Sequence, residues 1–141
     1  MTMTYDPDNI FARILRGELP SHKVYEDAGT FAFLDIMPRV DGHLLVIPKT
    51  PARNLLDASP AQLAAVMTTV QKLSNAARQV YEADGITIQQ FNEAAGGQEV
   101  FHLHVHVLPR HEGQRLRPPG TMADAGVLKD HADRLRAALA D

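Results

Sequence analysis

Cysteine and tryptophan are both absent from this 141-residue chain, and aromatic residues make up only 6% of it. The lack of cysteine excludes disulfide bonds, thiol nucleophiles and cysteine-ligated zinc. No apolar run approaches the about 20 residues that a membrane-spanning helix needs. The opening residues, MTMTYDPDNI, contain no basic segment followed by an apolar core, so no secretory signal is recognisable. These absences predict a cytoplasmic protein without membrane contact.

The chain also lacks a strong charge of either sign, with 14 basic and 17 acidic residues and a net charge of −3. Tight binding to polymeric nucleic acid requires a broad basic surface, which this balance does not provide. A small phosphorylated ligand is compatible with it, because such a ligand needs only a local group of hydrogen-bond donors. The length and the 45% hydrophobic content suit one domain with its own core.

Hydrophobic periodicity predicts an α+β fold with a mostly antiparallel, five-stranded sheet and one long helix packed on it. The expected strands are 24–26, 31–35, 44–47, 86–91 and 102–108. The last two are separated by a short loop and are predicted to form a hairpin, with Pro109 ending the second strand.

The long helix begins at a strong start signal, in which Ser59 is the N-cap, Pro60 follows it and Gln62 closes a capping box. Apolar residues at helical spacing continue this helix to about Glu82. A short helix is expected over 9–16, with Asp8 as its N-cap and Gly17 as its stop. We expect one domain over 1–141, in which 110–141 form a C-terminal extension that is first irregular and then helical over 123–140.

Residues 102–108 read His-Leu-His-Val-His-Val-Leu. In a β-strand, alternate side chains point to the same face, so His102, His104 and His106 are predicted to share one face. The opposite, core-facing side would hold Leu103, Val105 and Val107. An imidazole titrates near neutral pH and serves as a base, an acid, a nucleophile or a metal ligand. A solvated strand face is the alternative, but three imidazoles at a strict period of two favour a reactive site.

A loop rich in small residues, 92–98, lies directly before these histidines. Consecutive glycines allow backbone N–H groups to converge on an anion, and Asn92 and Gln98 would add amide donors. Further back, Gly42 suggests a close approach of the chain, and His43 would lie at the mouth of the 44–47 strand. His43 joins the site only if the fold brings it to the three histidines.

Four segments resemble, in order, the histidine triad (HIT) superfamily of nucleotide hydrolases and transferases. They are Phe33-Leu-Asp-Ile36, Gly42-His-Leu-Leu-Val-Ile-Pro48, Asn92 to Gln98 and His102-Leu-His-Val-His-Val-Leu108. The resemblance runs from about Ile10 to Arg110 and is greatest to the small bacterial proteins of the Hint group. It implies a HIT-like fold and a homodimer joined through the long helix and a strand.

The resemblance implies a role for each matching histidine. His104 would be the nucleophile that attacks the α-phosphorus and forms a nucleotidyl-histidine, which water then hydrolyses. His106 would contact the phosphate and assist the leaving group. His102 and His43 would orient the site and relay protons.

The resemblance also implies a nucleotide-binding set. Asp35 matches a carboxylate that accepts hydrogen bonds from ribose hydroxyls. The apolar walls around the base would be Ile10, Phe11 and Ile36, and the phosphate would lie near Asn92, Gly97, Gln98, Glu99 and Val100. No cofactor and no bound metal are expected.

Two departures from the family pattern stand out. Many bacterial relatives carry a pair of cysteines that help to bind structural zinc, and the corresponding stretch here is Asn9-Ile-Phe-Ala12, so that zinc site is expected to be absent. Glu99 stands where better-known relatives have Ser or Thr near the phosphate. A carboxylate there would repel a phosphate unless it points away, which affects the choice of leaving group.

The expected function is hydrolysis of nucleoside 5′-phosphoramidates or related nucleotide conjugates, with purine nucleotides favoured. One alternative within enzymes is cleavage of dinucleoside polyphosphates. A second alternative is a nucleotide-binding protein with little catalysis. A third is a zinc site on the alternating histidines, which is disfavoured because no carboxylate stands at ligand spacing in the sequence.

Overall fold

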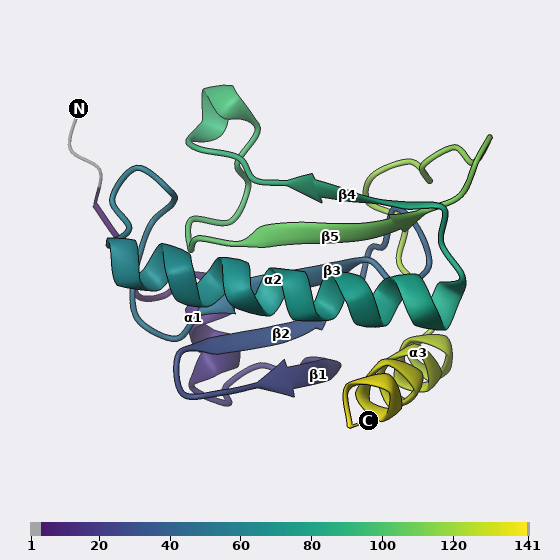
Figure 1. Ribbon diagram of the computed structural model, residues 1–141. Helices are drawn as coiled ribbons and strands as arrows, with labels where there is room; N and C mark the ends of the chain where they lie inside the picture. The colour runs from purple at the N-terminus through teal and green to yellow at the C-terminus, as the bar shows by residue number, and fades with distance from the viewer. Residues whose placement is uncertain (1–3, 141) are drawn as a thin grey trace.

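The computed structural model describes residues 4–140 and contains a five-stranded antiparallel sheet (Figure 1). The strand order is β1-β2-β3-β5-β4. The strands are β1 (Lys23–Glu26), β2 (Thr30–Leu34), β3 (Leu44–Pro48), β4 (Gly85–Gln89) and β5 (Val105–Arg110). All neighbouring pairs are antiparallel, including the β4–β5 hairpin. The predicted fold class is therefore confirmed.

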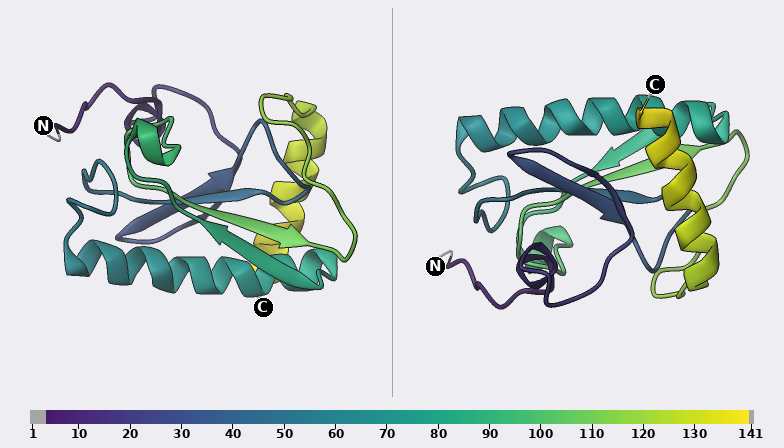
Figure 2. Two further views of the ribbon diagram at one scale, coloured as in Figure 1. Left: turned by 90° about the horizontal axis from the view of Figure 1, so that it is seen from above. Right: turned by 90° about the horizontal axis from the view of Figure 1, so that it is seen from below.

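Helices cover both faces of the sheet (Figure 2). The long helix α2 (Pro60–Tyr81) and the C-terminal helix α3 (Ala125–Leu139) pack on one face, and the short helix α1 (Ile10–Leu15) lies on the other. Because both faces are covered, every residue of β2 and of β3 is buried. This is why β3 reads as a continuous apolar run rather than as an alternation.

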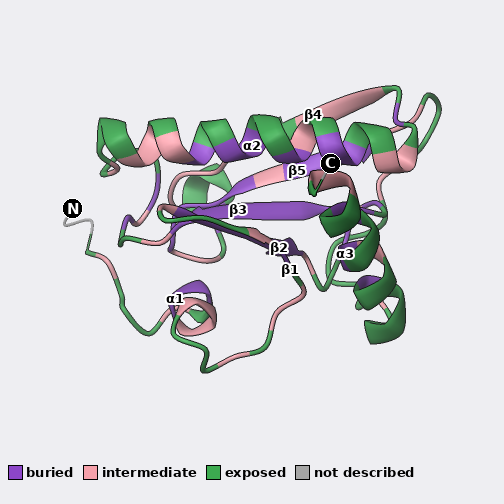
Figure 3. Cartoon of the chain, turned by 60° about the horizontal axis from the view of Figure 1, so that its bottom comes forward, coloured by how far each residue is buried: buried purple, intermediate pink, exposed green. Residues whose placement is uncertain are grey.

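Each face has its own apolar cluster. The side of α2 that faces the sheet is buried (Figure 3). Leu73 and Ala77 of α2 belong to one cluster with Val46 and Val107 of the sheet and Leu135 of α3. The α1 side of the sheet carries a smaller cluster, which consists of Phe11, Phe31, Phe33, Leu45 and Ile47. None of the helices within residues 4–140 is long and apolar enough to cross a bilayer.

The start of α2 is confirmed: Ser59 accepts from the N–H of Gln62, and the Gln62 side chain accepts from the N–H of Ser59. The predicted cap of the first helix is wrong, because Asn9 rather than Asp8 is the N-cap of α1 and accepts from the N–H of Ala12. Gly17 has the positive φ, 77°, of a residue that ends a helix.

Strand β5 differs from its predicted bounds at both ends. It begins at Val105 rather than at His102, and it continues through Pro109 to Arg110. Pro109 is tolerated because β3 pairs with β5 only as far as Val107, so at Pro109 the strand has β4 as its sole partner. Strand β4 ends at Gln89, two residues before its predicted end.

The irregular segment 111–124 crosses the loop between β2 and β3 before α3 begins. The N–H of Arg117 donates to the carbonyl of Arg39 over 2.8 Å, and the N–H of Ala123 donates to the carbonyl of Ile36 over 3.0 Å. The start of α3 is at Ala125 with Asp124 as N-cap, two residues later than predicted. The C-terminal extension is therefore fastened to the loop that leads into β3.

Candidate active site

The histidines gather on the α1 side of the sheet, but they do not all lie in one strand. His106 is in β5 opposite Leu45 of β3, whereas His102 and His104 lie in the irregular segment before β5. The prediction of one continuous histidine strand is wrong: pairing with β3 ends at Val105, and before it the N–H of Leu103 donates to the carbonyl of Ala52, outside the strand. The core-facing side chains of Leu103, Val105 and Val107 are buried as predicted.

His43 does join the site, through a direct contact with His106. Its Nε2 lies 2.9 Å from Nδ1 of His106, and its Nδ1 accepts from the N–H of Arg39 over 3.0 Å. Because Nδ1 of His43 is an acceptor, the proton of the neutral ring is on Nε2, and it is donated to His106. His106 is then left with its own proton on Nε2, facing away from His43.

His104 has the opposite arrangement of its ring nitrogens. Its Nδ1 lies 2.7 Å from the carbonyl oxygen of His102, which can only accept, so the ring proton is on Nδ1. The lone pair is therefore on Nε2. The ring is 7% exposed and lies edge-on to both Phe11 and His106, with centroids 5.0 Å apart in each case. His104 thus presents an unprotonated nitrogen in a fixed orientation.

Burial keeps these imidazoles neutral. It lowers the pKa of His43 and of His102 to about 4 and that of His106 to about 3. Burial also lowers the pKa of His104, against the hydrogen bond to the His102 carbonyl and the charge of Glu99, which raise it. A neutral imidazole is the nucleophilic form, so the site is ready to react near neutral pH.

These pKa values predict that the protein loses stability as the pH falls from 7 to 5. An unfolded histidine has a pKa of about 6.5 and takes up protons in this range, whereas the buried rings do not, so protons favour the unfolded chain. The raised pKa of Asp35 has the opposite effect, because protons then favour the folded chain, but it involves one group against several histidines. Urea unfolding midpoints at pH 7, 6 and 5 measure the effect, and His106→Asn is expected to reduce the slope. A midpoint that does not change over this range would contradict the assignment of neutral rings.

Asp35 lies beside this pair of histidines. Its Oδ2 is 3.7 Å from Nε2 of His43, and its Oδ1 accepts from the N–H of Met37 over 2.9 Å. The shorter contact of His43 is with His106, and burial lowers the His43 pKa to about 4, so Asp35 and His43 do not form an ion pair at neutral pH. Burial, with a smaller contribution from Glu99, raises the pKa of Asp35. One carboxylate oxygen therefore stays available to a ligand.

The three residues expected to surround a base differ in exposure. Phe11 is buried, whereas Ile10 and Ile36 are 48% and 43% exposed. Ile10 begins α1, and Ile36 lies in the loop that follows Asp35. Ile10 and Ile36 are therefore the two of these three residues whose apolar side chains are open to solvent.

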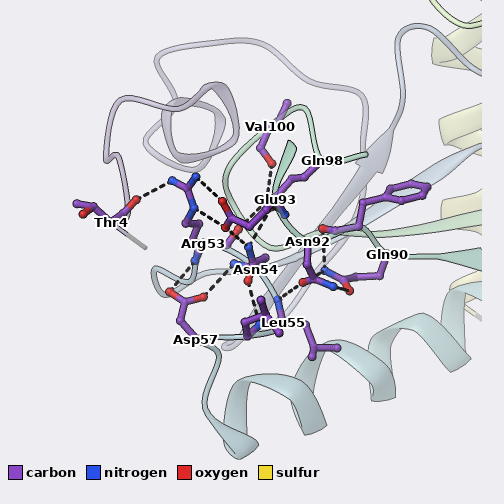
Figure 4. Close-up of polar contacts among 12 residues, drawn as sticks. Thr4, Arg53, Asn54, Leu55, Asp57, Gln90, Asn92, Glu93, Gln98 and Val100 are labelled. Atoms are coloured by element: carbon purple, nitrogen blue, oxygen red, sulfur yellow. Dashed lines mark hydrogen bonds and ion pairs between the residues drawn. The ribbon is translucent and has the colours of Figure 1, made fainter. Parts of the chain in front are cut away.

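In the loop before His102, Gln98 is a structural residue. Its side chain is buried; its oxygen accepts from the N–H of Glu93 and from Asn54, and its nitrogen donates to the carbonyls of Arg53 and Val100 (Figure 4). Every donor of this amide is therefore occupied, and it has none left for a phosphate. Asn92 likewise bonds Gln90 and accepts from the N–H of Leu55.

The backbone donors of this loop also differ from the prediction. The N–H groups of Gly96, Gly97 and Gln98 donate to carbonyls within the turn, so they do not converge on an anion. Within residues 4–140, no hydrogen bond occupies the N–H of Glu99 or of Val100. These two groups, between the loop and His102, are therefore free backbone donors. The Glu99 side chain is exposed.

Sequence reasoning missed the ion pair that holds the loop in place. Arg53 contacts both oxygens of Glu93, with distances of 2.7 and 2.9 Å, and Asn54 donates to the same carboxylate. Glu93 has a φ of 65°, which is unfavourable for a residue with a side chain, and these contacts hold it there. The partners are about 40 residues apart, and nothing in the local sequence pairs them.

A metal ion is disfavoured at this site by the hydrogen bonds of His43. Asp35, His43 and His106 each place one ligand atom within 4.8 Å of the others, so the expectation that no carboxylate lies at ligand distance is wrong. A metal on Nε2 of His43 would require the proton to be on Nδ1, where it would face the N–H of Arg39. Two buried donors would then oppose each other, which is costly.

The zinc site of the cysteine-bearing relatives also lacks its ligands. The stretch that corresponds to the cysteine pair, by the resemblance described above, runs from Asn9 to Ala12, and the side-chain oxygen of Asn9 is used to cap α1 at the N–H of Ala12. Neither residue supplies a thiolate, so the side chains at these positions do not fit that metal site.

Comparison with known proteins places this geometry in a family. A family model described as the HIT domain matches residues 16–113. The chain belongs to the HIT family. A solved structure, a Hit-like protein involved in cell-cycle regulation from Bartonella henselae, is 50% identical with a TM-score of 0.92, covering 95% of this chain and 98% of that one. The likeness to that HIT protein therefore extends beyond the family region.

Two further HIT relatives carry functional names. A hypothetical histidine triad nucleotide-binding protein from Sulfolobus tokodaii is 31% identical with a TM-score of 0.87, covering 93% of this chain and 91% of that one. The adenylylsulfatase HINT3 of Arabidopsis thaliana is 38% identical over 109 residues, which is 77% of this chain and 55% of that protein.

Proposed function

We propose that this HIT protein hydrolyses nucleoside 5′-phosphoramidates or related nucleotide conjugates through a nucleotidyl-histidine at His104. The observation that carries the proposal is the tautomer of His104, whose Nδ1 donates to the His102 carbonyl and whose Nε2 is left as a nucleophile. Imidazole suits this role because it attacks well when neutral and leaves well once phosphorylated.

In the first step, Nε2 of His104 attacks the α-phosphorus and the bond from phosphorus to the leaving nitrogen breaks. His106 gives its Nε2 proton to that nitrogen, which departs as an amine. The hydrogen bond from His43 to Nδ1 of His106 stabilises the electron-rich ring that remains. The carbonyl of His102 stabilises the positive charge on His104 at the same time.

In the second step, water attacks the phosphorus of the nucleotidyl-histidine. Its proton goes to Nε2 of His106, and the bond between phosphorus and Nε2 of His104 breaks. The products are a nucleoside monophosphate and the starting forms of both rings, so protons and bonds balance over the cycle.

Binding of the nucleotide uses the residues around this centre. Asp35 is proposed to accept from the ribose hydroxyls, and the apolar surface of Ile10 and Ile36 to cover the base. The free N–H groups of Glu99 and Val100 are proposed to donate to the phosphate. Donors that are already in place stabilise the charge of the reacting phosphoryl group without having to rearrange during the reaction.

Glu99 favours an amine over an anionic leaving group. Its charge raises the pKa of both Asp35 and His104, so its electric field reaches the place where the phosphate is proposed to bind. Dinucleoside polyphosphates and adenylyl sulfate, the substrate class in the name of the Arabidopsis relative, both release an anion. The negative charge of Glu99 would oppose these substrates more than phosphoramidates, because the amine that a phosphoramidate releases carries no negative charge.

Steady-state assays with adenosine 5′-phosphoramidate, adenylyl sulfate and diadenosine polyphosphate test the proposal. We expect the phosphoramidate to have the highest kcat/KM. Glu99→Gln should reduce the ratio of its kcat/KM to that of the other two substrates by roughly fivefold, since one nearby charge is worth about 1 kcal/mol. Glu112→Gln, on an exposed residue outside the site, is the matched control. If AMP is released from none of the three substrates, the proposed function is wrong. If Glu99→Gln leaves the ratios of kcat/KM between the substrates unchanged, Glu99 does not contribute to specificity.

A further inference from the structure

The N-terminal segment reaches the histidines through Tyr5. The hydroxyl oxygen of Tyr5 lies 2.7 Å from Nδ1 of His102, and the two rings meet edge-on with centroids 5.6 Å apart. These residues are 97 positions apart in the chain. His102 is only 1% exposed, so this contact is made in the interior rather than at the surface.

The direction of this hydrogen bond follows from the other side of the ring. Nε2 of His102 lies 2.9 Å from the carbonyl oxygen of Pro48, which can only accept, so the ring proton is on Nε2. Nδ1 then carries the lone pair, and the Tyr5 hydroxyl is the donor. The ring of His102 is therefore held at both nitrogens.

The segment that carries Tyr5 is itself anchored to the site. Arg53 donates to the carbonyl of Thr4 over 2.8 Å with the same guanidinium that pairs with Glu93 (Figure 4). That guanidinium also lies 4.3 Å from the ring centroid of Phe101, the residue next to His102. One side chain thus ties together the N-terminal segment, the loop before the histidines and the chain leading into them.

We propose that Tyr5 is a positioning residue for the nucleotidyl transfer, an inference that rests on the proposed function. Its hydroxyl holds His102 in one tautomer and one orientation, and this keeps the His102 carbonyl aligned with the Nδ1 proton of His104. Tyr5 acts through His102 and does not touch the reacting atoms.

Loss of the hydroxyl would free Nδ1 of His102 to take up a proton. The groups that face His102 are the Tyr5 hydroxyl, the Pro48 carbonyl and His104, and none of them is a carboxylate. A proton on His102 would place a positive charge beside His104 and weaken it as a nucleophile. The effect would therefore be largest on the acid side of the pH profile.

Tyr5→Phe tests this positioning role, with Tyr25→Phe as the matched control. Tyr25 also loses a hydroxyl that makes a hydrogen bond, in this case to Asp27 in the β1–β2 turn. We expect Tyr5→Phe to lower kcat about three- to tenfold at pH 6, with KM within about twofold of its original value. The acid limb of its kcat profile should also move to higher pH. Tyr25→Phe should keep the original profile.

Two-bond ¹H–¹⁵N correlation spectra of the histidine rings give a second readout that does not depend on turnover. The unsubstituted protein should show His102 protonated at Nε2 and His104 protonated at Nδ1, and Tyr5→Phe should alter the His102 pattern. Unchanged spectra and an unchanged pH profile in Tyr5→Phe would overturn the inference, even if the variant melts earlier. An unsubstituted protein that turns over no nucleotide would refute the proposed function, while the spectra would still decide the role of Tyr5.

Discussion

Replacing His104 with alanine is expected to lower kcat by about 10⁴-fold or more and to change nucleotide affinity only a few-fold. The size of the effect follows from the covalent route, because no other ring nitrogen described in the site is both unprotonated and free of a hydrogen bond. His43 and His102 each use both nitrogens, and the free nitrogen of His106 carries a proton. Binding should survive because Asp35, Ile36 and the loop donors remain.

Initial rates, together with nucleotide affinity by isothermal titration calorimetry, measure the two effects separately. A rapid alkaline quench followed by peptide mass spectrometry should find a nucleoside monophosphate on the peptide that contains residue 104, and no adduct in the alanine variant. His22→Ala removes a histidine that lies outside the site and should turn over at the original rate. Turnover by His104→Ala at the original rate would rule out the covalent mechanism.

Gly42→Ala is expected to destabilise the protein by about 2–4 kcal/mol, from backbone strain and overpacking together. Gly42 has a φ of 82°, and a Cβ there would lie 2.3 Å from Cε2 of Tyr81. The Tyr81 ring cannot easily retreat, because it stacks on His131 and its hydroxyl bonds Nδ1 of that residue. Arg134 lies over the same ring. His43 follows Gly42 directly, so we also expect a loss of activity.

Two other glycines separate the causes of this effect. Gly113 has a φ of 73°, and a Cβ there would meet nothing within 4 Å, so Gly113→Ala should cost only the backbone strain, about 1–2 kcal/mol. Gly85 has neither a positive φ nor a close neighbour, and Gly85→Ala should be close to neutral. Urea unfolding of the three variants compares them directly. Equal losses for Gly42→Ala and Gly113→Ala would show that the contact with Tyr81 has no cost.

The parts of the fold that sequence can predict are those specified by neighbouring residues. The capping box of α2 lies within four residues, and the buried run of β3 ends at its own proline. The five strands follow from local alternation and from apolar runs between turn residues. The predicted cap of α1 is wrong because Asp8 and Asn9 are both good caps, and the sequence does not decide between adjacent candidates.

The site can be predicted only in part, because several of its residues meet through the fold. His43 and His106 are 63 positions apart, and only the pairing of β3 with β5 makes them neighbours. Alternation predicts the three histidines on one strand face, but β5 begins only at Val105, and the N–H of Leu103 between His102 and His104 donates to Ala52, about 50 positions earlier. The tautomers depend on carbonyl and N–H groups of the backbone, which no side-chain pattern records.

The hydrogen bonds between the C-terminal extension and the loop before β3 bear on where the functional domain ends. Residues 16–113 match the family model and contain all four histidines of the site. The loop whose Arg39 N–H fixes the tautomer of His43 is held by Arg117 and Ala123, which lie beyond that match. A chain cut at the end of the family match would keep all four histidines. It would lose the hydrogen bonds from Arg117 and Ala123 to the loop whose Arg39 N–H keeps the proton of His43 on Nε2.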